Sequence, residues 1–64
     1  MAIYEVRNSE SDEWDSENTR RRFKTKPPAV KCFEEERRRG EFVRLIRWHD
    51  YTLRELHRAN DHTN

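Results

Sequence analysis

An acidic segment with one tryptophan at its centre is the most distinctive feature of this chain. Trp14 has no apolar neighbour close to it in the sequence, and five carboxylates surround it, Glu10, Asp12, Glu13, Asp15 and Glu17. An exposed indole ringed by charge is typical of a protein-binding hot spot, because a rigid apolar anchor gives affinity while the charges steer association. Carboxylates at this density could also imitate a phosphate backbone and occupy a nucleic-acid-binding groove of another protein. The alternative is a flexible, solvated loop over residues 8–19 whose Trp14 folds back over a sheet.

A basic segment follows directly. Five cations and one aromatic ring stand within seven residues, namely Arg20, Arg21, Arg22, Phe23, Lys24 and Lys26. Such a cluster neutralises phosphates and offers a ring that stacks on a base, so it indicates direct nucleic-acid binding with a strong salt dependence. The neighbouring acidic segment argues against a dedicated nucleic-acid binder. In the alternative interpretation these charges lie on an edge strand and form solvated ion pairs.

Metal and catalytic sites are not indicated by the sequence. The available metal ligands are Cys32, His49, His57, Asp61 and His62, and only the pair His57 and His62 approaches a zinc-binding spacing. Cys32 lies on the apolar side of a predicted helix, where a small buried hydrophobic residue is usual. The chain has one glycine, which excludes a glycine-rich loop around a phosphate. We therefore expect a protein that is not an enzyme and that uses no metal and no cofactor.

The length and composition predict a single small domain over residues 1–64 with a thin core. Of the 64 residues, 42% are charged, yet the net charge is only +1. Leu, Ile, Val and Phe together are fewer than is usual in a folded domain, although the aromatic residues favour folding. A domain of this size is marginally stable alone, so we expect a partner protein or a second copy in a homodimer to contribute to its stability.

The charges are distributed unevenly along the chain. Residues 1–19 contain one basic and six acidic side chains, whereas residues 20–64 contain 13 basic and seven acidic ones. The protein can therefore present either sign of charge to a partner. No apolar run is long enough to span a membrane, and the polar start does not resemble a secretory or transit peptide. A single cysteine fits a reducing cytosol, so we expect a cytoplasmic protein.

The first half of the chain gives clear structural signals. Residues 2–7 mix β-branched and aromatic side chains with partial alternation and predict a strand. Residues 20–25 predict a second strand with Phe23 as its single inward residue. Residues 27–39 predict a helix that begins at two prolines, carries Glu–Arg pairs three and four residues apart, and ends before Gly40 in a left-handed cap.

Residues 41–59 support two interpretations. Residues 41–48 alternate in a way that favours a strand, and the spacing from Thr52 to Glu55 matches a capping box at the start of a helix over 52–59. The alternative is one continuous helical stripe over 41–59. We favour the strand followed by the helix and expect residues 60–64 to fray.

These elements predict an α+β fold of the order β-β-α-β-α, with a three-stranded antiparallel-type sheet and the helix 27–39 packed on one face. The alternative is a β-hairpin followed by a helical hairpin that turns at Gly40. In layout, over residues 3–48, the chain resembles the small proteins that phages make to disable host machinery, including inhibitors of host RNA polymerase and anti-CRISPR proteins. The resemblance implies a stoichiometric inhibitor that binds a nucleic-acid-handling complex in the host cytoplasm.

Overall fold

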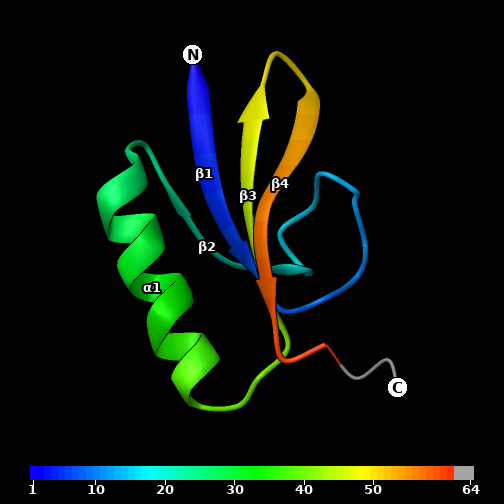
Figure 1. Ribbon diagram of the computed structural model, residues 1–64. Coiled ribbons are helices and arrows are strands. Elements are labelled where there is room, and N and C mark those ends of the chain that lie inside the picture. The colour runs from blue at the N-terminus through cyan, green and yellow to red at the C-terminus, as the bar shows by residue number, and fades with distance from the viewer. Residues whose placement is uncertain (62–64) are drawn as a thin grey trace.

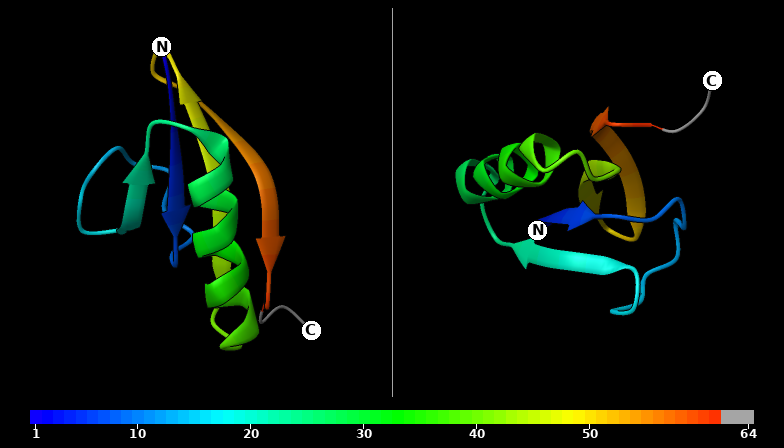
Figure 2. Two further views of the ribbon diagram at one scale, coloured as in Figure 1. Left: turned by 90° about the vertical axis from the view of Figure 1, so that its left-hand side faces the viewer. Right: turned by 90° about the horizontal axis from the view of Figure 1, so that it is seen from below.

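The computed structural model describes residues 1–61 and shows an α+β domain with one helix and four strands (Figure 1). The elements in chain order are β1 Ala2–Arg7, β2 Thr19–Phe23, α1 Lys26–Arg38, β3 Val43–His49 and β4 Thr52–Ala59. The strands form one antiparallel sheet in the order β2-β1-β3-β4, so β2 and β4 are its edges. The helix covers one face of the sheet, and the loop 8–18 lies on the other side (Figure 2).

The first half of the sequence folds largely as predicted. β1 coincides with the predicted strand 2–7, and β2 overlaps the predicted strand 20–25. The helix follows Thr25, whose backbone is extended, and has proline in its first turn, where a missing N–H has no effect on the helical ladder. It ends before Gly40, which adopts the predicted left-handed conformation with φ +78°.

The prediction of a helix over 52–59 is wrong, and the sheet has four strands rather than three. Residues 52–59 form β4, which pairs with β3 from His49 opposite Thr52 to Val43 opposite Ala59. The two residues between the strands, Asp50 and Tyr51, both have positive φ, at 49° and 65°. This is the geometry of a two-residue hairpin turn whose twist matches the flanking strands. The capping-box spacing therefore has no structural role here, and both the continuous helix over 41–59 and the helical hairpin are excluded as well.

The face of the sheet under α1 holds the apolar core. Val6 of β1 and Val43 and Leu45 of β3 are fully buried there against Ala29 and Phe33 of the helix. Successive side chains of a strand point to opposite faces, so the residues that alternate with these lie on the other face. Those residues include Glu5 and Arg7 of β1 and Arg44, Ile46 and Trp48 of β3, and all of them are buried.

The end of the described chain is attached to the rest of the domain. Asn60 donates hydrogen bonds from its amide nitrogen to the carbonyl oxygens of Arg37, at 2.8 Å, and Glu41, at 2.9 Å. Of the tail predicted to fray, residues 60–64, the last three lie outside the described residues. Within residues 1–61, no helix is long and apolar enough to cross a membrane.

Candidate protein-binding surface

The second face of the sheet is organised around one buried carboxylate. Glu5 accepts hydrogen bonds from Arg7 Nε at 2.6 Å, Trp48 Nε1 at 2.7 Å and Thr19 Oγ1 at 2.5 Å. Arg22 Nε approaches the same carboxylate at 3.6 Å. Glu5 and Arg7 are fully buried, whereas the alternation of apolar side chains along β1 predicts that they face solvent. Arg7 also donates a hydrogen bond to the carbonyl oxygen of Ser11 in the loop 8–18.

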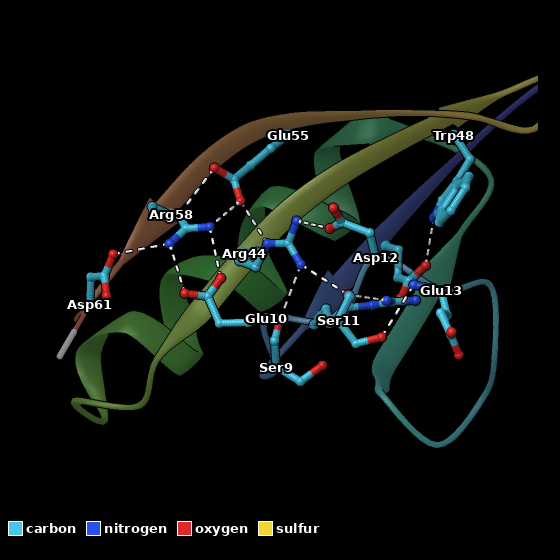
Figure 3. Close-up of polar contacts among 12 residues, drawn as sticks. Ser9, Glu10, Ser11, Asp12, Glu13, Arg44, Trp48, Glu55, Arg58 and Asp61 are labelled. Carbon is cyan, nitrogen blue, oxygen red and sulfur yellow. Dashed lines mark hydrogen bonds and ion pairs between the residues drawn. The ribbon is translucent and has the colours of Figure 1, made fainter. Parts of the chain in front are cut away.

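Arg44 of β3 fastens this loop to the sheet (Figure 3). Its guanidinium donates to Asp12 of the loop and to Glu55 of β4, each at 2.6 Å. It also donates to the carbonyl oxygens of Ser9, at 3.2 Å, and Ser11, at 3.0 Å. Burial alone would lower the pKa of Arg44, but the hydrogen bonds to Glu55 and Asp12 raise it above its usual value. Arg44 is therefore a permanently charged anchor for the loop backbone.

Arg58 of β4 forms a second attachment at the edge of the sheet. Its guanidinium lies 2.9 Å from Glu10 of the loop and 3.0 Å from both Glu55 and Asp61. The hydrogen bond from Arg58 and the one from Arg44 lower the pKa of Glu55, and hydrogen bonds to Glu55, Glu10 and Asp61 raise the pKa of Arg58. Two loop carboxylates are thus neutralised by arginines of the sheet.

These contacts change what the acidic loop can present to a partner. Glu10 and Asp12 face arginines, and Asp15 accepts hydrogen bonds from the backbone N–H and the side-chain amide of Asn18. The carboxylates of Glu13 and Glu17 are exposed and form no ion pair within the described part of the chain. The predicted cluster of five therefore divides into three carboxylates with partners inside the fold and two that form no ion pair within residues 1–61.

Trp14 packs against the sheet and is also partly exposed to solvent. Its ring packs edge-on against Trp48 with the ring centroids 5.0 Å apart and an interplanar angle of 84°. The guanidinium of Arg22 lies over the Trp14 ring at 3.7 Å from its centroid, a cation–π contact. Trp14 nevertheless remains 51% exposed. The indole folds back onto the sheet and is held in place, and about half of it stays available for contact.

Trp14 borders a hollow of about 250 Å³ at the end of the sheet where the β3–β4 turn lies. The residues around it are mainly apolar and come from β1, the acidic loop and the β3–β4 hairpin: Met1, Ile3, Trp14, Trp48, Asp50 and Tyr51. Tyr51 at the turn is 99% exposed and Met1 is 97% exposed. Trp48 and Tyr51 are close in the sequence, but only the fold places them beside Trp14.

The basic segment is divided between two faces. Arg22 points to the loop side and is engaged by Trp14 and Glu5, whereas Phe23 is half-buried against the core. Arg20 and Arg21 lie beside α1, where a groove of about 550 Å³ is lined by Arg20, Arg21, Cys32, Glu35, Glu36, Arg38 and Arg39. Glu36 pairs with Arg20 at 3.8 Å and with Arg39 at 3.5 Å. Lys24 and Lys26 are exposed.

Cys32, His49 and His57 belong to no group of side chains that could hold a metal ion in the described structure. Burial and the neighbouring Glu36 raise the pKa of the Cys32 thiol, which disfavours the nucleophilic thiolate. Residues 1–61 contain no group of three or more His, Cys, Asp and Glu side chains that could hold a metal ion. His62 lies outside the described residues.

Comparison of the chain with protein-family models, with curated proteins and with solved structures finds no match.

Proposed function

We propose that this protein is a non-catalytic protein-binding module whose contact surface is centred on Trp14. The observation that carries the proposal is the group of exposed aromatic and aliphatic side chains at one end of the sheet, Trp14, Tyr51 and Met1, around a shared hollow. Such a cluster on so small and so charged a protein is typical of an interaction site.

The way Trp14 is held supports this proposal. Arg22 and Trp48 fix the orientation of the ring, so a partner would meet an anchor that loses little side-chain entropy on binding. Glu13 and Glu17 are the loop carboxylates that remain free to attract a partner of positive charge. We therefore centre the proposed contact surface on Trp14, Glu13 and Glu17, because the other three predicted residues, Glu10, Asp12 and Asp15, have partners inside the fold.

The charge of this surface favours a partner with a basic groove, as in proteins that handle nucleic acids. The module would then act as a stoichiometric inhibitor or modulator that occupies the groove in place of a phosphate backbone. The layout resemblance to phage proteins that disable host machinery is consistent with this mode of action.

Affinity capture from a nuclease-treated lysate tests the proposal. A partner that binds through this surface is expected to be captured by the wild type and lost with Trp14→Ala and with the double variant Glu13→Lys, Glu17→Lys. The matched control is Glu41→Lys, which reverses an exposed charge at the other end of β3. Capture that is equal for all four proteins would contradict the proposal.

A second candidate function is nucleic-acid binding through the basic groove between β2 and α1. The observation in its favour is that Arg20, Arg21, Arg38 and Arg39 line one groove, while Lys24 and Lys26 extend the positive charge along the chain. Binding of a single-stranded oligonucleotide should then weaken steeply with added salt and disappear in the variant Arg20→Glu, Arg21→Glu. Oligonucleotide binding that Trp14→Ala abolishes and this variant leaves intact would exclude the groove.

A further inference from the structure

We infer that the hollow between Trp14, Trp48 and Tyr51 binds a lysine or arginine side chain of the partner protein. This inference rests on the proposed function and names the chemistry by which the surface recognises its partner. Four observations support it: the aromatic walls, the carboxylate at the rim, the backbone conformation of the turn and the size of the hollow.

Three of the side chains that line the hollow are aromatic, and their ring faces attract cations. Trp14 already shows this preference within the fold, since the Arg22 guanidinium lies 3.7 Å from its ring centroid. Trp48 donates its indole N–H to the buried Glu5 carboxylate at 2.7 Å, a hydrogen bond that increases the electron density of the indole. Met1 and Ile3 add an aliphatic wall for the methylene stem of a long basic side chain.

The hollow also has a carboxylate at its rim. Asp50 lines it with a side chain that is 77% exposed, and its Oδ2 lies 3.5 Å from Nδ1 of the neighbouring His49. A cation held against the aromatic rings would therefore meet a negative charge at the entrance. Aromatic faces together with an acidic rim select a cationic side chain over a neutral one of the same length.

The backbone conformation of the β3–β4 turn indicates that Tyr51 has a role in binding rather than in stabilising the fold. Both turn residues have positive φ, and glycine or asparagine usually occupies the second position of such a turn because a bulky side chain is strained there. Tyr51 gains no burial in return, since it is 99% exposed. A strained residue that does not pack against its own fold is typical of a binding position.

The size of the hollow fits one side chain. At about 250 Å³ it is below the range of sites that enclose a whole drug-sized ligand, which starts at roughly 300 Å³. It is also open at the end of the sheet, where a projecting side chain of another protein can enter. A lysine or arginine from a basic groove meets both conditions.

A ligand titration of the intact protein, monitored by NMR, tests this inference. The probes are lysine and norleucine, each as the N-acetyl methylamide, which share the aliphatic stem and differ in the ammonium group. The lysine probe is expected to shift the indole N–H signals of Trp14 and Trp48 and to bind about tenfold more tightly than the norleucine probe. Equal affinities would show an apolar pocket only, and the absence of shifts at the highest soluble concentration would also overturn the inference.

Two variants separate binding from folding. Asp50→Asn removes the charge and keeps a residue that tolerates positive φ, so the fold should persist while the lysine probe binds about fivefold more weakly. Tyr51→Gly relieves the backbone strain of the turn and removes the aromatic ring. Thermal stability should therefore be unchanged or higher, while the affinity for the lysine probe falls by a similar factor. Glu41→Gln, at the opposite end of β3, is the matched control and should bind the probe as the wild type does.

The outcomes distinguish this inference from the proposed function. If a protein partner is captured through Trp14 but Asp50→Asn binds it unchanged and the lysine probe does not bind, the inference fails and the protein-binding function stands. If the lysine probe binds as expected but Trp14→Ala captures the same proteins as the wild type, the pocket stands and the proposed function fails.

Discussion

The two faces of the sheet are stabilised by different kinds of interaction. Under α1, Val6, Val43 and Leu45 pack against the helix as an apolar core. Under the loop 8–18, Glu5 and Arg44 are just as deeply buried, but their contacts are hydrogen bonds and ion pairs. Apolar packing is non-directional and has no charges for salt to screen, whereas a buried ion pair requires each partner in place. The helix face therefore stabilises the fold by apolar packing, whereas the loop face does so by directional contacts that also position Trp14.

Truncation in the apolar core should have the largest effect on stability. Phe33 is 5% exposed and packs at the centre of the helix face. Phe33→Ala is expected to lower the free energy of unfolding by about 4 kcal/mol, because it removes buried surface and leaves a cavity. Urea denaturation should show this loss equally at low and high salt. A loss that changed strongly with salt would contradict the assignment of this face to apolar packing.

Removal of the buried carboxylate should cost slightly less and should be repairable. Glu5→Leu leaves Arg7 charged, buried and unpaired, and is expected to destabilise the fold by about 3 kcal/mol. Arg7 Nη2 already lacks a hydrogen-bond partner in the described structure, so the pair is not fully satisfied. The double variant Glu5→Leu, Arg7→Met should recover much of the loss, as measured by thermal melting. A double variant less stable than Glu5→Leu would show that the pair is essential rather than replaceable.

Removal of the loop anchor should have an intermediate effect confined to the loop face. Arg44→Met breaks the hydrogen bonds to Asp12, Glu55 and the loop carbonyls and is expected to lower stability by about 2 kcal/mol. Because Trp14 is held by this loop, its fluorescence should shift toward that of a solvated indole while the far-ultraviolet circular dichroism of α1 and the sheet persists. Unchanged tryptophan emission would show that the loop does not depend on Arg44.

Acid should produce the smallest of these effects, again on the loop face. Arg58 and Arg44 hold the pKa of Glu55 below its ordinary value of 4.5. The ionised carboxylate therefore stabilises the folded state above that value, and the contribution is lost as the pH falls through the lowered pKa. Stability measured by urea denaturation should decline below about pH 4.5, and Glu55→Gln should have a shallower decline. An identical pH profile for the two proteins would remove Glu55 from the loop attachment.

The local elements of the first half of the fold could be predicted because their signals are short-range. The prolines and Gly40 mark the two ends of α1 through restrictions on single backbone torsions, and the alternation of Tyr4 and Val6 marks β1. The second half could not be resolved in this way. The capping-box spacing from Thr52 to Glu55 predicted a helix over residues 52–59 from local signals alone, and the long-range pairing of β4 with β3 overrode it.

The candidate site shows the same division. The sequence by itself determined that Trp14 is surrounded by carboxylates and has no apolar neighbour close to it in the chain. It also determined that the chain, with one glycine, lacks a glycine-rich phosphate loop. Only the tertiary structure decided that Glu10 and Asp12 face Arg58 and Arg44, that Arg22 stacks on Trp14, and that Tyr51 comes to lie at the same hollow. The physical reason is that composition fixes which charges and rings exist, whereas pairing between residues more than thirty positions apart depends on strand register and on how the loop crosses the sheet.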